Sequence, residues 1–236
     1  MTGCLQDKVA IVTGSSRVLG KAFAFGFAEE GASVVVTSRT RESARSVAAE
    51  LAAAGHEALA LELDVASEES VAALARETLA RFGRIDILVN NAGIAVPFRH
   101  LVDLPVEDWD RTFQVNLRGA FLCCRAVLPA MVGQRYGKII NIAAGVHEER
   151  VHVGMSAYCA SKIGLVNLTR SLAAEVRQHG VHVNAIDPGA VRTGMAESFE
   201  ISEETTAWLA KQQTLDVPAE LRFRPPGHIV PLAVFL

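Results

Sequence analysis

The chain has 236 residues and a formal net charge of −3 at pH 7, with 23 Lys and Arg against 26 Asp and Glu. Half of the residues are apolar, so one large α/β domain with a full core fits this length better than two small domains. The charge balance and the lack of a Lys/Arg-rich run argue against nucleic acid or an acidic membrane surface as partners. No apolar run reaches the roughly 18 residues of a membrane span and no signal peptide is evident, so we expect a soluble, cytoplasmic protein.

Disulfide and metal chemistry are not expected. The four cysteines show neither CxxC spacing nor a disulfide framework, which favours reduced thiols. The nearest approach to a metal motif contains His147 and His152, which are five positions apart. An HExxH motif instead places two histidines one helical turn apart, on the same face. We therefore predict no metal site.

The first expected strand, 8–12, leads into the glycine-bearing segment 13–20 and a helical pattern that stops at Gly31. Strand, glycine turn and helix form the setting in which free N–H groups and the helix dipole can hold a phosphate. The glycines do not follow GxGxxG, so an ordinary βα turn is the alternative reading of this segment.

A second buried strand, 33–37, ends at Ser38 and Arg39. In a dinucleotide-binding fold this position faces the adenosine ribose, where an acidic residue prefers a free 2′-hydroxyl and an arginine accommodates a 2′-phosphate. Guanidinium groups suit phosphate oxygens, so Arg17 and Arg39 could clamp that phosphate. Two solvated arginines are the alternative, but we favour NADP(H) over NAD(H).

The alternation of strands and helices continues along the chain. Further strands are expected at 57–63, 85–89, 138–142 and 181–186, and further helices at 43–54, from Ser67 to near Gly83, at 106–132 with Pro129 kinking its end, and at 156–178. Strands separated by helices of this length imply βαβ crossovers and a parallel sheet with helices on both faces. The fold class is therefore α/β, a doubly wound parallel sheet (Rossmann fold) in three α/β/α layers, with residues 1–236 in a single domain.

The sixth strand ends at 187–193, and open α/β sheets place ligands beyond the carboxyl ends of their strands. Asn116 falls in mid-helix, where an amide is not favoured, although a solvated side chain would explain it. The polar, helix-prone segment 194–223 follows the last strand and is a candidate substrate lid. A plain pair of surface helices is the alternative for 194–223.

Tyr158 and Lys162 are one helical turn apart, so both side chains lie on one helix face. An ammonium within about 4–6 Å of a phenol lowers its pKa, which would make Tyr158 a proton donor and acceptor near neutral pH. Tyrosine and lysine also occur at this spacing on ordinary surface helices, so the pair alone does not define a site.

Several short motifs occur in a fixed order. They are Thr13-Gly14…Gly20, Asp64-Val65, Asn90-Asn91-Ala92-Gly93, Asn116, Tyr158…Lys162 and Pro188-Gly189…Thr193. Together they resemble the short-chain dehydrogenase/reductase family, and the match covers nearly the whole chain. The resemblance implies a hydride transfer between NADP(H) and a small-molecule carbonyl or alcohol.

The resemblance also implies residue roles. Tyr158 would exchange a proton with the substrate oxygen, Lys162 would lower the tyrosine pKa and bind the nicotinamide ribose, and Asn116 would hold a water in a proton relay. Tyr158 and Lys162 thus also count as cofactor contacts, together with Ser38 and Arg39. The remaining cofactor contacts would be Gly14, Ser16, Arg17, Leu19 and Gly20 at the phosphates, Asp64 and Val65 at the adenine, Asn90, Ala92 and Gly93 at the middle, and Pro188, Gly189, Val191 and Thr193 at the nicotinamide.

Two positions depart from the family pattern inside the site. Val18 stands where the family has glycine, and overpacking by its isopropyl group would cost roughly 1–3 kcal/mol, or about five- to more than a hundredfold in cofactor affinity. The active-site serine is missing, because alignment from the fifth strand places Ala144 there and counting back from Tyr158 places Gly145. Loss of such a donor costs roughly a hundred- to a thousandfold in turnover, unless His147, Ser156 or a lid residue replaces it.

A third departure is at the end of the sequence. The chain stops at 234–236, in what resembles the family's last helix, without the seventh strand that follows there. We expect that the sequence is truncated, and the alternative is a sheet that ends with an uncovered sixth strand. The resemblance also implies a homo-oligomer, a dimer or tetramer, packed through the helices around Asn116 and Tyr158. The missing serine and Val18 leave an alternative function open, a catalytically impaired family member that acts as an NADP(H)-binding sensor or scaffold.

Overall fold

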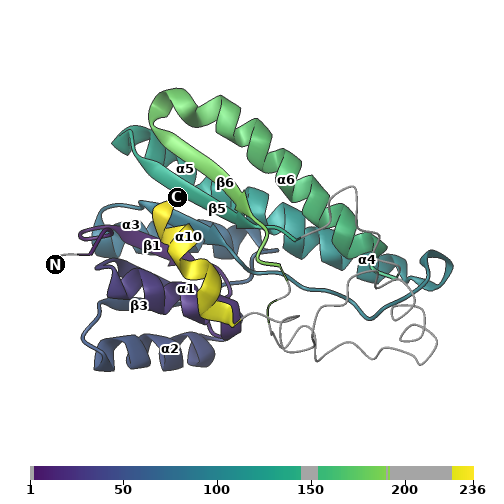
Figure 1. The fold of residues 1–236 in the computed structure, drawn as a ribbon, viewed down its shortest axis with the longest axis horizontal. Helices are drawn as coiled ribbons and strands as arrows, with labels where there is room; N and C mark the ends of the chain where they lie inside the picture. The colour runs from purple at the N-terminus through teal and green to yellow at the C-terminus, as the bar shows by residue number, and fades with distance from the viewer. Residues whose placement is uncertain (1–2, 145–153, 190, 192–224) are drawn as a thin grey trace.

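A six-stranded parallel sheet forms the centre of the computed structural model, which describes residues 3–144, 154–189, 191 and 225–236. Its strands are β1 (Val9–Val12), β2 (Ser33–Ser38), β3 (Ala58–Glu62), β4 (Ile87–Asn90), β5 (Gly137–Ile142) and β6 (Val181–Ile186). They lie in the order β3-β2-β1-β4-β5-β6 (Figure 1). The order reverses between β1 and β4, so the predicted doubly wound sheet is confirmed, and its switch point lies beside β1 and β4.

Helices cover both faces of the sheet. They are α1 (Val18–Glu29), α2 (Arg41–Ala53), α3 (Glu68–Phe82), α4 (Val106–Phe113), α5 (Gly119–Gln134), α6 (Ser156–Val176) and α10 (Val230–Phe235). The short helices are η1 (Leu101–Asp103), η2 (Gln114–Arg118), η3 (Arg177–His179) and η4 (Pro226–Ile229). Buried side chains of α1, α2 and α10 pack on one face, and those of α3, α5 and α6 on the other. The three-layer prediction is confirmed.

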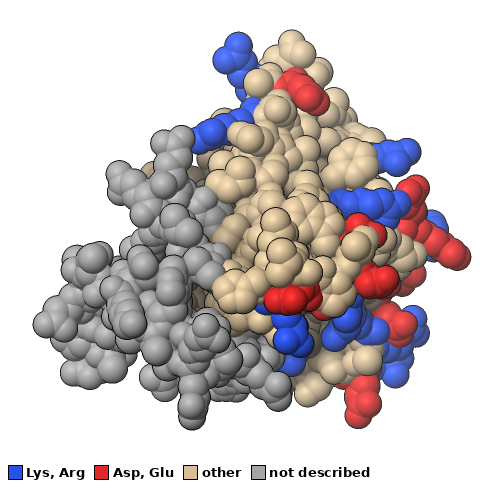
Figure 2. Space-filling view, turned by 90° about the vertical axis from the view of Figure 1, so that its right-hand side faces the viewer, with Lys and Arg blue, Asp and Glu red and all other residues tan. Residues whose placement is uncertain are grey.

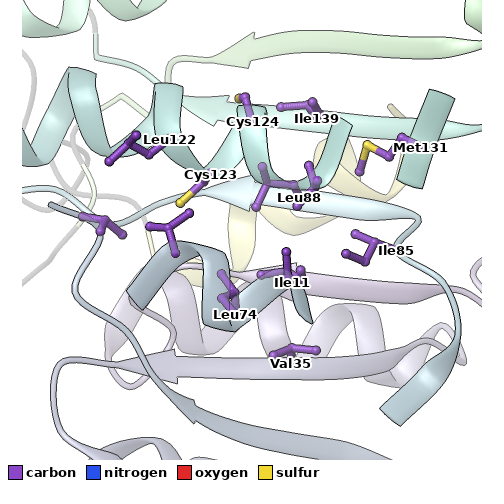
Figure 3. Packing of buried hydrophobic residues seen from close by; sticks show 14 of the residues in the cluster. Ile11, Val35, Leu74, Ile85, Leu88, Leu122, Cys123, Cys124, Met131 and Ile139 are labelled. Carbon is purple, nitrogen blue, oxygen red and sulfur yellow. The ribbon is translucent and has the colours of Figure 1, made fainter. Parts of the chain in front are cut away.

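The core beneath α3 and α5 explains why the sequences of the central strands are continuous apolar runs. Ile11 of β1 and Leu88 of β4 meet Leu74 of α3 and Met131 of α5 (Figure 3). All four residues of β1 and all four of β4 are buried, as expected for strands with helices on both faces. The sheet is therefore a rigid base for the loops at its carboxyl edge.

Helix α2 begins earlier than the sequence predicts. The Thr40 hydroxyl accepts a hydrogen bond from the Ser43 amide at 3.4 Å, so the N-cap is Thr40 and the predicted start at Ser43 is wrong by two residues. Both predicted ends of α3 (Glu68–Phe82) are confirmed. Ser67 caps α3, and Gly83 ends it in the left-handed conformation with φ 73°.

The long helical region expected at 106–132 is three elements, α4, η2 and α5, and α5 continues beyond Pro129 to Gln134. By length and composition alone the run Val106–Gln134 is long and apolar enough to cross a membrane, although no membrane span was predicted from the sequence. Cys123, Val127 and Met131 of α5 are fully buried against the sheet. This run is therefore a core helix of the domain.

Several predictions concern residues outside the described part of the chain. They are the possible serine equivalent Gly145, the histidines His147 and His152, the cofactor contact Thr193 and the candidate lid 194–223.

Candidate active site

The Thr13 side chain joins the ends of β1 and β4. Its hydroxyl accepts hydrogen bonds from the Asn91 and Ala92 amides, both at 2.9 Å, and donates to the Val89 carbonyl at 3.2 Å. The Asn91 side chain donates in return to the carbonyls of Thr13 and Gly14, at 2.9 and 3.1 Å. Thr13 and Asn91 belong to the motifs of the sequence but were not predicted as site residues. A motif shows that such residues are present, but it does not show which groups their side chains bind.

The turn between β1 and α1 and the first turn of α1 leave little room for side chains at two glycines. Gly14 has φ 63°, and a Cβ at this residue would lie 3.2 Å from the Ala92 Cα. A Cβ at Gly20 would lie 2.3 Å from the Gly14 carbonyl oxygen. The closely packed backbone forms a cradle at the start of a helix, which fits a pyrophosphate held by N–H groups. Leu19, predicted as a cofactor contact, is buried in the core beneath this cradle.

Val18, the first residue of α1, has a strained backbone. Its φ is 37°, in the left-handed region that a β-branched residue rarely adopts, and its exposed fraction is 37%. The sequence predicted a steric conflict with the cofactor at this position. The structure adds a second cost, which is the strain of the Val18 backbone itself. Glycine would adopt this φ without an energetic penalty.

A hollow of about 510 Å³ lies between α1 and α2, beside the cradle. Its lining residues are Ser16, Arg17, Lys21, Ser38, Arg39, Thr40, Glu42, Ser43, Ser46, Val47 and Glu50. The structure thus brings together Ser16, Arg17, Ser38 and Arg39, which the sequence predicted as cofactor contacts. In the part of the chain that the structure describes, neither arginine is in an ion pair.

The predicted adenine contacts lie in the loop between β3 and α3. The Asp64 carboxylate accepts a hydrogen bond from the Ala66 amide at 2.9 Å, and the Asp64 amide donates to the Ser70 hydroxyl at 3.0 Å. Val65 is buried against α5, where a Cβ at Gly119 would lie 2.9 Å from its side chain. Asp64 is exposed, so of the two only its side chain is free to meet a ligand.

A buried chain of polar side chains connects the sheet to α6. Asn90 donates to the Asn141 side chain, and Asn141 donates to the Thr169 hydroxyl, both at 2.8 Å. Thr169 donates to the Leu165 carbonyl, also at 2.8 Å. The Asn90 side chain, predicted to face the cofactor, is therefore used inside the core. Asn141 and Thr169 were not predicted as site residues. Asn141 could have been found from the sequence, because it is a polar residue in the apolar strand β5.

Asn116 lies in η2, a π-helical turn between α4 and α5, and is 1% exposed. Its side-chain carbonyl oxygen accepts a hydrogen bond from the Ile94 backbone amide at 2.8 Å. Its amide group donates to the Ile94 carbonyl at 2.9 Å and to the Ser161 hydroxyl at 3.1 Å. The alternative of a solvated asparagine is excluded, and the unfavoured mid-helix amide is explained by a π turn, a geometry that is frequent at functional sites.

Lys162 and Asn116 meet at Gly93. A Cβ at Gly93 would lie 3.3 Å from the side-chain carbonyl oxygen of Asn116 and 3.6 Å from the Lys162 ammonium nitrogen. The lysine is 4% exposed and donates to the Ile142 carbonyl at 2.6 Å. Its nitrogen lies 5.8 Å from the centre of the Tyr158 ring. Three predicted site residues and the tyrosine beside them therefore come together beyond the ends of β4 and β5.

The charge state of this pair differs from the prediction. Burial raises the pKa of Tyr158 to about 12, with smaller effects of Cys159 and Asp187, and burial lowers the pKa of Lys162 to about 8. The predicted lowering of the phenol pKa is wrong for this arrangement, because burial outweighs an ammonium that is bonded to the Ile142 carbonyl. At neutral pH the phenol is protonated and the lysine is mostly charged.

No hydroxyl follows β5 at the described candidate for the active-site serine. The Ala143 amide donates to the Ile186 carbonyl at 2.8 Å, and Ala144 comes next. Ser156, the first residue of α6, has a buried hydroxyl that has no hydrogen-bond partner among the described residues. At the end of β6 the Gly189 amide donates to the Asp187 carboxylate at 2.8 Å.

The predicted nicotinamide contacts after β6 are described only in part. Gly189 has φ 66°, and within the described part of the chain no atom lies within 4 Å of a Cβ placed on it. Pro188 precedes it half-buried, and Val191 is 9% exposed. This loop therefore offers open backbone at the edge of the sheet where Lys162 and Asn116 lie.

Comparison with known proteins agrees with this geometry. The sequence profile of a family described as short chain dehydrogenase matches residues 8–204. The subunit BbsD of a hydroxy(phenyl)methylsuccinyl-CoA dehydrogenase from Thauera aromatica is 39% identical, over 89% of this chain and 82% of its own length. A 3-oxoacyl-(acyl-carrier-protein) reductase from Synechocystis sp. is 42% identical, over 83% of this chain and 78% of its own.

Solved structures show the same fold. A short-chain type dehydrogenase/reductase from Mycobacterium marinum superposes with a TM-score of 0.86 at 32% identity, over 98% of this chain and 89% of that chain. The fold and the site thus define a nucleotide-binding α/β oxidoreductase. The chain belongs to the short-chain dehydrogenase/reductase family.

Replacing Val18 by glycine is expected to raise the free energy of unfolding by about 1 kcal/mol, because the left-handed backbone then carries no side-chain penalty. Urea unfolding of the parent and the variant measures this change. Val18→Ala is the matched control, since it removes the isopropyl group and keeps the Cβ that causes the strain. A gain of equal size in both variants would contradict backbone strain as the cause.

Replacing Lys162 by methionine is expected to change how stability depends on pH. A folded-state pKa of about 8 lies below the ordinary 10.5, so between these values the unfolded parent binds more protons than the folded parent. Stability of the parent relative to Lys162→Met should therefore rise from pH 8 to pH 10, by on the order of 3 kcal/mol at most. Urea unfolding at several pH values tests this, and parallel curves would contradict it.

Proposed function

We propose that this protein is an oxidoreductase that transfers hydride between NADP(H) and a carbonyl or alcohol substrate, with Tyr158 as general acid and base. The observation that carries the proposal is the meeting of Asn116 and Lys162 at Gly93, beside Tyr158 and the glycine cradle. The family membership supports the reaction class. The substrate is a small molecule.

The residues fit a dinucleotide in this site. The cradle of Gly14 and Gly20 suits the pyrophosphate, Asp64 is placed for the adenosine half, and the loop of Pro188 and Gly189 for the nicotinamide half. When bound, the cofactor supplies or accepts the hydride. Thr193 and Val191 complete the proposed set of contacts on the nicotinamide side.

The protein's own groups handle the proton. Tyr158, which its raised pKa keeps protonated at neutral pH, donates its proton to the carbonyl oxygen during reduction. Lys162 places a positive charge beside the proton that leaves, and Asn116 holds the loop after β4 against α6. We propose that Asn116 also positions a water in the relay that returns the proton to Tyr158.

Preference for NADP(H) rests on the hollow between α1 and α2. Arg17 and Arg39 both line it, and Ser38, which ends β2, adds a hydroxyl in place of the carboxylate that would favour NAD(H). Among similar structures is one from Beutenbergia cavernae, described as an NAD(P)-dependent gluconate 5-dehydrogenase with NADP bound at low occupancy. It is 36% identical, with a TM-score of 0.86 over 98% of this chain and 90% of that chain.

We further propose a cytoplasmic homo-oligomer, with residues 194–223 as a substrate lid. A groove of about 530 Å³ lies on the helices proposed for subunit packing, with lining residues Asp110, Phe113, Gln114, Leu117, Arg118, Phe121, Gly164 and Leu168. Figure 2 faces the side of the molecule where α4 and the start of α6 lie, and it shows a broad area of uncharged surface with acidic and basic side chains at its margin. A second copy of the chain is the proposed occupant of the groove.

A catalytically impaired family member that binds NADP(H) as a sensor or scaffold is the second candidate function. The left-handed φ of Val18 and the absence of a hydroxyl at Ala144 favour it. Binding of NADPH without turnover of any carbonyl substrate is the result that this candidate predicts.

Replacing Ala144 by serine separates the two functions. If the site lacks only the donor, the variant should reduce ketones or aldehydes about a hundred- to a thousandfold faster than the parent. Oxidation of NADPH, followed by its absorbance over a panel of carbonyl compounds, measures the rates. Tyr158→Phe in both backgrounds is the control and should lower the rate by at least about a hundredfold. Turnover that does not depend on Tyr158 would refute the proposed mechanism.

The two directions of the reaction are expected to differ in their pH dependence. Oxidation of an alcohol needs the phenolate, and a Tyr158 pKa of about 12 makes that form scarce at neutral pH. The oxidation rate should therefore rise continuously from pH 7 to pH 10, by up to about tenfold per pH unit. The reduction rate should stay nearly constant up to about pH 7 and fall above it, because Lys162, with a pKa of about 8, is half deprotonated at pH 8. A plateau of the oxidation rate near pH 7 would contradict the assignment.

A further inference from the structure

Lys21 and Glu50 form an ion pair inside the hollow that we assign to the 2′-phosphate. The Lys21 ammonium lies 2.6 Å from the Glu50 carboxylate, and the side chains are 36% and 46% exposed. Lys21 comes from α1, one turn after Arg17, and Glu50 comes from the last turn of α2. Both line the same hollow as Arg17 and Arg39. The pair therefore belongs to the proposed binding surface as well as to the contact between two helices.

The hollow has a nearly balanced set of charges. Its basic lining residues are Arg17, Lys21 and Arg39, and its acidic ones are Glu42 and Glu50. Glu50 neutralises the only lysine among them and repels any phosphate that enters. An ion pair this exposed adds little to stability, so its lysine can change partners at low cost.

We propose that Lys21 is a specificity-determining residue, a third cation for the 2′-phosphate, and that Glu50 limits its contribution. A lysine has a flexible four-carbon stem and a compact charge, so it can turn from the carboxylate toward a phosphate dianion in the same hollow. Glu50 thereby sets how strongly the protein prefers a 2′-phosphorylated nucleotide. This inference rests on the proposed function only in assigning the hollow to the 2′-phosphate.

A purely structural role makes a different prediction. If the pair only connects α1 to α2, loss of either charge lowers stability slightly and leaves nucleotide preference unchanged. If Lys21 binds phosphate, loss of its charge and loss of the Glu50 charge act on the preference in opposite directions. The sign of the two effects therefore separates these roles.

The test uses the parent, Lys21→Met, Glu50→Gln and the double variant, with adenosine 2′,5′-bisphosphate and 5′-AMP as probes in titration calorimetry. Lys21→Met should weaken binding of the 2′-phosphorylated probe by about tenfold, and Glu50→Gln should tighten it by about three- to tenfold. Binding of 5′-AMP should change by less than about twofold in each. The double variant should lie between the two single variants. More salt should shrink the differences.

Glu57→Gln is the matched control, because it breaks the ion pair of Glu57 with Arg81, and neither residue lines the hollow. It should leave the ratio of the two affinities unchanged. Equal ratios in parent, Lys21→Met and Glu50→Gln, or shifts in the same direction, would overturn the inference. A parent that does not distinguish the two probes would overturn it as well.

The outcome is independent of catalysis. Preference for the 2′-phosphorylated probe without any turnover of carbonyl substrates supports the role of Lys21 and refutes the oxidoreductase proposal. Turnover with either nicotinamide cofactor, together with equal binding of the two probes, supports hydride transfer and refutes the role of Lys21.

Discussion

The hydroxyl of Thr13 makes three hydrogen bonds, and the arrangement of the site depends on them. It receives two amides of the loop after β4 and binds a carbonyl of β4 itself, so the loop cannot move independently of the glycine turn after β1. The same loop continues to Ile94, whose amide and carbonyl both bind Asn116. Through these contacts the proposed phosphate cradle and the proposed catalytic helices share one frame. The reversal of strand order between β1 and β4 makes this possible, since it places the two loops side by side.

The electrostatics of the site follow from burial more than from pairing. Lys162 is almost inaccessible to water and has one hydrogen-bond partner among the described residues, the Ile142 carbonyl, so its charge is kept at a cost to stability. Tyr158 experiences the same low polarity and retains its proton. At neutral pH the site therefore holds a protonated phenol beside a mostly charged lysine, and a bound cofactor would change the environment of both groups.

The sequence was sufficient for the fold, and the structure brings together the predicted residues Asn116, Tyr158 and Lys162. Apolar β-branched runs separated by amphipathic helices define a parallel sheet, and β6 was placed without error because Gly180 and Asp187 bound it. The starts of helices were predicted less accurately, as α2 shows. The hydroxyl residues Thr40 and Ser43 both lie near its start, and the structure has Thr40 as the N-cap. The φ of Val18, the π turn at Asn116 and the raised pKa of Tyr158 could not be predicted, because each depends on contacts between segments far apart in the chain. The roles of Asn116, Tyr158 and Lys162 remain predictions of the resemblance, which the geometry supports by bringing them together.

The π turn has a consequence for how this helix can vary. A π turn contains one residue more than a regular helical turn, so α4 and α5 are out of phase with each other by about 100°. Deleting a single residue from 114–118 would give a continuous α-helix, but it would rotate α4 by this angle relative to the sheet. Asn116 would leave Ile94 and Ser161, and the face of α4 at the groove would turn elsewhere. Substitutions that keep Asn116 therefore preserve the phase of the two helices, whereas insertions and deletions of one residue do not.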